Sequence, residues 1–167
     1  MSACITRVGA VVALALVLVK PATSASETLG TPISVYMMRG VCSRLVFSGR
    51  NATDRCVPRV INASYVNGRT SFIFTVGDLA IVSFSGVRVD QVKITSNKVS
   101  QPVDSVTLTL LGMGSATHPV TTKAVGSCVY TNPYEGRATV SCSAQTSEGL
   151  MLGTFTSNGL PPEEAEF

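Results

Sequence analysis

Alternation of apolar and polar residues is the dominant pattern of this chain. The stretch "PRVINASYVNGRTSFIFTVGDLAIVSFSG", residues 58 to 86, alternates on both sides of two glycine-containing pairs, Asn67-Gly68 and Gly77-Asp78. Both pairs suit two-residue turns between antiparallel strands, because glycine and asparagine tolerate positive φ. The stretch therefore predicts a three-stranded meander.

Two-residue turns fix which side chains of this meander share a face. One face is mostly apolar, and the other is mostly polar. Burying each large apolar side chain contributes about 1.5 to 3 kcal/mol, so the apolar face is expected to be the core. The expected core residues are Ile61, Ala63, Tyr65, Phe72, Phe74, Val76, Leu79 and Ile81, and the opposite face holds Asn62, Ser64, Arg69, Ser71, Ile73, Thr75 and Val82.

Further strands are predicted elsewhere, and no stretch after the N-terminal segment shows a helical period. "RATVSCSA" (137–144) places Ala138, Val140, Cys142 and Ala144 on one face, and "DSVTLTLL" (104–111), "PISVYMM" (32–38) and "DQVKIT" (90–95) also suit strands. Residues 112 to 126 are expected to form a loop. About nine to ten short strands predict an all-β fold, an antiparallel sandwich or barrel, which the pattern does not distinguish.

The N-terminal residues differ from the rest of the chain. Arg7 is followed by an apolar run of twelve residues, then by Lys20, Pro21 and small residues. This is typical of a secretory signal peptide, because a membrane-spanning helix needs about 20 apolar residues and Lys20 interrupts the run. We expect residues 1–25 to be a signal peptide, 26–160 a single all-β domain without a transmembrane segment, and 161–167 an acidic flexible tail.

Removal of the signal peptide, which contains Cys4, leaves an even number of cysteines, four. Cysteines of exported proteins commonly form disulfides, because the compartments outside the cytoplasm are oxidising. We therefore expect a periplasmic or extracellular location. Three connectivities are possible. The equal spacing favours two hairpins, Cys42–Cys56 and Cys128–Cys142. In the second, Tyr130 faces Val140; in the first, the bend centres on Gly49 and Arg44 faces Asp54.

The residues offer little catalytic chemistry. The only histidine, His118, lies three residues after Ser115, but no orienting acid or oxyanion hole is identifiable beside them. With the cysteines oxidised, too few ligands remain for a zinc site, and no glycine-rich phosphate loop precedes a helix. We therefore expect neither an enzyme nor a cofactor or metal.

Basic residues give one feature above background. Six arginines fall between residues 39 and 69, with Asp54 as the sole acid among them. If these segments fold as hairpins, Arg50, Arg55, Arg59 and Arg69 can form a patch that binds an anionic ligand. The alternative is that these arginines lie on solvated strand faces, where arginine is common. Without the signal peptide, two of thirteen basic residues and none of the ten acidic ones are lost, leaving a net charge of +1. That charge disfavours nucleic acid as a partner.

These features favour a non-enzymatic exported binding or envelope module, whose partner is an envelope or extracellular protein or an acidic glycan. The alternative is a secreted inhibitor of a hydrolase, a lysozyme or protease, that presents the loop "TNPYEGR" (131–137). The lack of tryptophan argues against a neutral sugar as ligand, because sugar rings commonly stack on exposed aromatic side chains. Tyr130 and Tyr134 are the candidates for such stacking. Asn51 and Asn62 lie in N-glycosylation sequons and are expected to be exposed.

Overall fold

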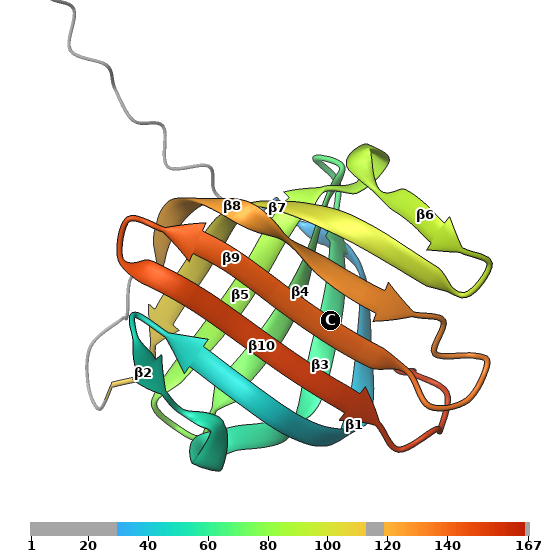
Figure 1. Ribbon diagram of the computed structural model, residues 1–167, viewed down its shortest axis with the longest axis horizontal. Helices are drawn as coiled ribbons and strands as arrows, with labels where there is room; N and C mark the ends of the chain where they lie inside the picture. Colours follow the sequence, from blue (N-terminus) through green and yellow to red (C-terminus); the bar gives the residue numbers. More distant parts are fainter. Residues whose placement is uncertain (1–29, 113–118, 166–167) are drawn as a thin grey trace, which may run out of the picture.

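Eight long strands form an antiparallel barrel in the computed structural model, which describes residues 30–112 and 119–165 (Figure 1). Two 3₁₀ turns and three short strands lie outside the barrel wall. The elements are β1 (Pro32–Phe47), β2 (Arg50–Asn51), η1 (Thr53–Arg55), β3 (Cys56–Tyr65), β4 (Arg69–Val76), β5 (Ala80–Val87), η2 (Arg88–Asp90), β6 (Val92–Thr95), β7 (Lys98–Leu110), β8 (Val120–Thr131), β9 (Thr139–Thr146), β10 (Gly149–Ser157) and β11 (Glu163–Glu164).

The barrel has an up-and-down topology. Each long strand pairs with the next long strand along the chain, and β10 pairs with β1, which closes the sheet. The prediction of an all-β fold is confirmed, and the choice between sandwich and barrel is resolved as a barrel. β8 begins at Val120, so part of the segment expected to be a loop is strand. Figure 1 shows β1, β9 and β10 across the front and β3 to β5 behind them.

The interior is filled with apolar side chains, as expected for eight strands. The prediction for "RATVSCSA" is confirmed, since its four apolar-face residues are all buried in this core. The core consists of Met38, Leu45, Val60, Phe72, Phe74, Val76, Ala80, Val82, Phe84, Val103, Val106, Ala124, Cys128, Ala138, Val140, Cys142, Ala144, Met151 and Phe155.

The predicted core residues of β4 are buried, as are Ala63 and Tyr65 of β3, but the predicted register of β3 and β5 against β4 is wrong by one residue. Both turns contain three residues rather than two, closed by hydrogen bonds from the Gly68 N–H to the Tyr65 carbonyl (3.0 Å) and from the Leu79 N–H to the Val76 carbonyl (2.9 Å). One extra residue in a turn moves every side chain of the adjoining strand to the other face.

As a result, Val60 and Val82, not Ile61 and Ile81, face Phe74 across the ladders. The apolar face can shift in this way because β3 and β5 carry apolar residues on both faces. Val60 and Val82 are fully buried, which restores the burial that the predicted register assigned to the two isoleucines.

Both predicted disulfides are present, Cys42–Cys56 and Cys128–Cys142. The second joins β8 to β9 in the predicted register, with Cys128 opposite Cys142 and Tyr130 opposite Val140. It is buried in the barrel interior.

The first disulfide joins β1 to β3, but the predicted hairpin around it is wrong in detail. The bend falls at Ser48-Gly49, where both residues have positive φ, and pairs Phe47 with Arg50. The chain then enters η1, which is held by a hydrogen bond from the Leu45 N–H to Thr53 Oγ1 (3.0 Å). Asp54 therefore lies in a 3₁₀ turn, and the expected pairing opposite Arg44 does not form.

The C-terminal residues also differ from the expectation of a flexible tail. Glu163 and Glu164 form β11, which pairs with Met37 and Tyr36 of β1, and the Ala165 N–H donates to the Val35 carbonyl at 2.9 Å. These contacts use the edge of β1 that β10 leaves open.

Two further expectations concern residues that the structure does not describe. The signal peptide 1–25 and the pair Ser115 and His118 lie outside the described residues. Among the residues that are described, no helix is long and apolar enough to cross a membrane.

Candidate functional site: the mouth of the barrel

The structure does not gather the four arginines of the predicted anionic patch. Arg50 in β2 and Arg55 in η1 lie at the end of the barrel that carries the β1–β2 turn. Arg59 lies further along β3, opposite Arg39 of β1. Arg69 is the first residue of β4, at the other end of the barrel, and its side chain forms an ion pair with Asp104.

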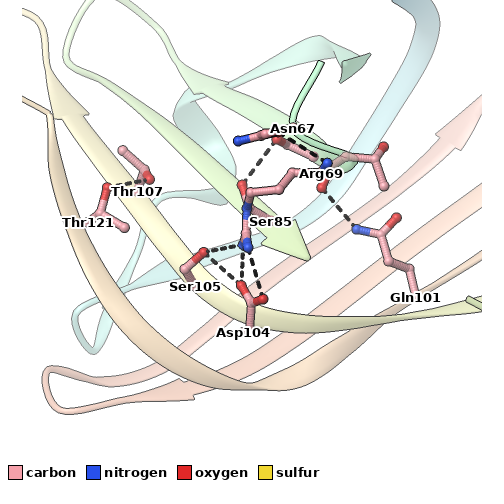
Figure 2. Close-up of polar contacts among 10 residues, drawn as sticks. Asn67, Arg69, Ser85, Gln101, Asp104, Ser105, Thr107 and Thr121 are labelled. Atoms are coloured by element: carbon pink, nitrogen blue, oxygen red, sulfur yellow. Dashed lines mark hydrogen bonds and ion pairs between the residues drawn. The ribbon is translucent and has the colours of Figure 1, made fainter. Parts of the chain in front are cut away.

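Arg69 reaches across β5 to β7 and bonds the carboxylate of Asp104 and the hydroxyl of Ser105 (Figure 2). Its side chain is only 10% exposed, whereas that of Asp104 is 50% exposed. Burial acts to raise the pKa of Asp104, but hydrogen bonds from Arg69 and Ser105 and the charge of Arg69 outweigh it and lower that pKa from its ordinary value of 3.8. Arg69 therefore joins β4 to β7 across the intervening strand β5.

This ion pair predicts an acid-dependent part of the stability. Because the folded-state pKa of Asp104 is lowered, its contribution is complete above about pH 5 and disappears as the pH falls through the folded-state value. Asp104→Asn is expected to lower the free energy of unfolding by about 1 kcal/mol at pH 7, a modest value because one partner is half exposed. The difference from wild type, measured by urea unfolding, should shrink as the pH falls below the ordinary pKa of 3.8.

Asp78→Asn, at the exposed β4–β5 turn, is the charge-matched control. Equal curves for the two variants across this pH range would contradict the assignment of the effect to Arg69 and Asp104.

A cavity of about 310 Å³ opens at the end of the barrel that carries the β8–β9 connection. We call it the mouth pocket. Side chains of β1, β3, β4, β8 and β9 form its wall, and residues of the β8–β9 connection and of the C-terminal segment line its opening. It is lined by Tyr36, Met38, Asn62, Phe72, Tyr130, Thr131, Pro133, Tyr134, Val140 and Pro162. Its volume is at the small end of the range of about 300 to 1,000 Å³ found for ligand pockets.

Aromatic rings dominate the mouth pocket. The rings of Phe72 and Tyr130 lie across the barrel with centroids 5.0 Å apart and planes tilted by 56°. Tyr134, in the β8–β9 connection, is 65% exposed and presents its ring at the opening. Burial raises the pKa of Tyr130, an effect that the charge of Arg88 partly offsets, so its phenol is neutral near pH 7. The pocket thus offers flat apolar surfaces with a few hydroxyl groups.

Asn62 supplies an oriented amide to the same pocket. Its Nδ2 donates to Thr70 Oγ1 (3.3 Å) and to the Ser71 carbonyl (3.1 Å). Gln101 bonds the Thr70 carbonyl (3.1 Å), and Gln91 in turn donates to Gln101 (3.1 Å). The two bonds from Nδ2 fix the amide of Asn62, and no described residue donates to its Oδ1. Because Asn62 faces inward, the expectation that its sequon is exposed is wrong.

The β8–β9 connection is held in one conformation by Asn132. Its backbone N–H donates to Asn97 Oδ1 (2.7 Å), its Nδ2 donates to Glu135 (2.8 Å), and its Oδ1 accepts from the Tyr134 N–H (3.1 Å). These bonds place Pro133 and Tyr134 at the pocket opening before any ligand arrives, which reduces the ordering cost of binding.

The side chains that line the mouth pocket are mostly apolar or uncharged. Its described lining contains phenols, one amide and threonine, but no carboxylate, imidazole or free thiol that would act as base or nucleophile. Among the described residues, no group of three or more histidine, cysteine, aspartate or glutamate side chains gathers to hold a metal.

Sequence reasoning identified only part of this site. It singled out Tyr130 and Tyr134 near the second hairpin tip, and Asn62 only as a sequon residue. Asn62 faces inward because the β3–β4 turn contains three residues. The sequence "VNG" (66–68) suits this turn, in which Gly68 has positive φ. Comparisons with known protein families, with curated proteins and with solved structures find no match to this chain.

Proposed function

We propose that the protein is an exported, non-enzymatic binding module that takes a small, flat, mostly apolar ligand into the mouth pocket. The observation that carries this proposal is the pocket itself, aromatic-lined and open at one end of an otherwise filled barrel. Small barrels commonly use this place to hold one small ligand.

The chemistry of the lining specifies the ligand further. Phe72, Tyr130 and Tyr134 favour an aromatic or other planar molecule, since stacked and tilted rings add to simple area burial. The Oδ1 of Asn62 favours a ligand that donates one hydrogen bond. The two disulfides support export, because such bonds form in oxidising compartments.

Titration with N-phenyl-1-naphthylamine, a neutral planar dye that fluoresces in apolar sites, tests the proposal. We expect saturable binding of one dye per chain. Tyr134→Ala should weaken it about fivefold, because the ring at the opening is lost while the exposed position leaves the barrel intact. Circular dichroism and thermal unfolding establish that each variant is folded.

Leu160→Ala is the matched control, since Leu160 is also 65% exposed and does not line the pocket. It should leave the dye affinity unchanged. Absence of saturable binding to the wild type, or equal effects of the two variants, would show that the mouth pocket is not the binding site.

A second candidate is the hydrolase inhibitor, which the braced β8–β9 connection and the exposed ring of Tyr134 favour. In that case the wild type would slow a lysozyme or a protease in a test panel, and Tyr134→Ala would abolish the inhibition whether or not the dye binds.

A further inference from the structure

A second cavity, of about 440 Å³, lies on the barrel surface along β1 and β10. We call it the Arg39 groove. It is separate from the mouth pocket and shares no lining residue with it. Its lining includes two arginines and no aromatic side chain, and consists of Arg39, Gly40, Val41, Pro58, Arg137, Thr156, Ser157 and Asn158.

Two arginines, Arg39 and Arg137, line this groove. A third, Arg59, pairs with Arg39 in the β1–β3 ladder next to the lining residue Pro58. Like charges placed opposite each other across strands are destabilising, so this arrangement favours an anion beside it. Within the part of the chain that the structure describes, Glu163 is the one carboxylate paired with these arginines.

Glu163 shows what the groove recognises. Arg39 donates from Nε to Oε1 at 3.0 Å and from Nη2 to Oε2 at 3.3 Å, the paired geometry in which a guanidinium binds an oxyanion. Both side chains are more than half exposed, so the contact is weak and open to competition. The hydrogen bond to Arg39 lowers the pKa of Glu163, which keeps the carboxylate charged near pH 7. Arg59 and Arg137 form no ion pair with any described residue.

We propose that the Arg39 groove is an anion site for a sulfated or carboxylated polysaccharide, in which oxyanion groups bind Arg137 and Arg59 and compete with Glu163 for Arg39. An acidic polysaccharide matches this place because the groove is open on the surface and the polar residues Thr156 and Asn158 line it together with Arg39 and Arg137. The site replaces the predicted patch and keeps only Arg59 of its four residues.

Titration of the folded chain with a heparin-derived octasaccharide at low salt tests this site, with inorganic sulfate as a second arm. We expect Arg39→Gln/Arg137→Gln to weaken octasaccharide binding at least about tenfold, the loss that follows when charge-assisted hydrogen bonds are removed. Arg50→Gln/Arg55→Gln removes the same charge from residues of β2 and η1 that do not line the groove, and should change the affinity less than twofold. Inorganic sulfate should bind more weakly than the octasaccharide and compete with it.

Glu163 provides a second, opposite test. Glu163→Gln should strengthen octasaccharide binding more than Glu164→Gln does, although both remove one negative charge, because only Glu163 bonds Arg39. Equal effects within either matched pair of variants would show that binding depends only on net charge, which would overturn the proposal. Absence of octasaccharide binding to the wild type would overturn it as well. The result is independent of the mouth pocket, since the neutral dye does not compete for guanidinium groups.

Discussion

Val82→Asp is expected to unfold the barrel, whereas Ile81→Asp, one residue earlier on the same strand, leaves it folded. Val82 is fully buried between Phe74 and Leu108, its neighbours on β4 and β7. An unpaired carboxylate there costs several kcal/mol, a large part of the 5 to 15 kcal/mol that typically stabilises a domain. Ile81 points outward and is only partly buried, so its replacement should cost about 1 kcal/mol.

Far-UV circular dichroism and urea unfolding of the two variants measure this difference. The pair also tests the register of the meander, because two-residue turns would place Ile81 inside and Val82 outside. Unfolding by Ile81→Asp with tolerance of Val82→Asp would contradict the observed β4–β5 turn.

Loss of the Cys128–Cys142 disulfide is expected to destabilise the protein more than loss of Cys42–Cys56. The two bonds close loops of the same length, with a sequence separation of 14, so each restricts the unfolded chain equally, by about 3 kcal/mol. They differ in the folded state. Cys128 and Cys142 are buried in the core, whereas Cys42 and Cys56 are only partly buried.

Paired alanine variants separate these two contributions. Cys128→Ala/Cys142→Ala should lose about 3 kcal/mol from the open loop and about 1 kcal/mol or more from the cavity left by two sulfur atoms. Cys42→Ala/Cys56→Ala should lose mainly the loop contribution. Free energies of unfolding from urea titration give the comparison, and an equal loss from both pairs would show that core packing around Cys128 contributes nothing.

The functional residues show why sequence reasoning stops short of the site. The mouth pocket joins Tyr36, Asn62 and Tyr130, which lie on three strands far apart in the chain and share no motif. The Arg39 groove likewise joins Arg39 and Arg137. A pattern within one strand gives the face of a residue but not its neighbours across the barrel.

Turn length limited the sequence reasoning most directly. Asn67-Gly68 and Gly77-Asp78 were both correctly identified as turns, yet each turn contains one residue more than expected. The strands beside them are apolar on both faces, so their composition does not correct the error. The β9 face and the Cys128–Cys142 register were predicted correctly because "RATVSCSA" is apolar on one face only and its cysteine spacing fixes the pairing.

The sequence by itself predicted that the chain is all-β and which face of β9 is buried, and its cysteine spacing favoured the two disulfides that form. These features depend on local periodicity and spacing, which each strand carries in its own residues. Only the tertiary structure decided that β10 pairs with β1, and with it the barrel, the mouth pocket and the grouping of Arg39 with Arg59 and Arg137. The physical reason is that backbone hydrogen bonds between strands are the same for any partner, so closure depends on how all eight strands twist and pack together.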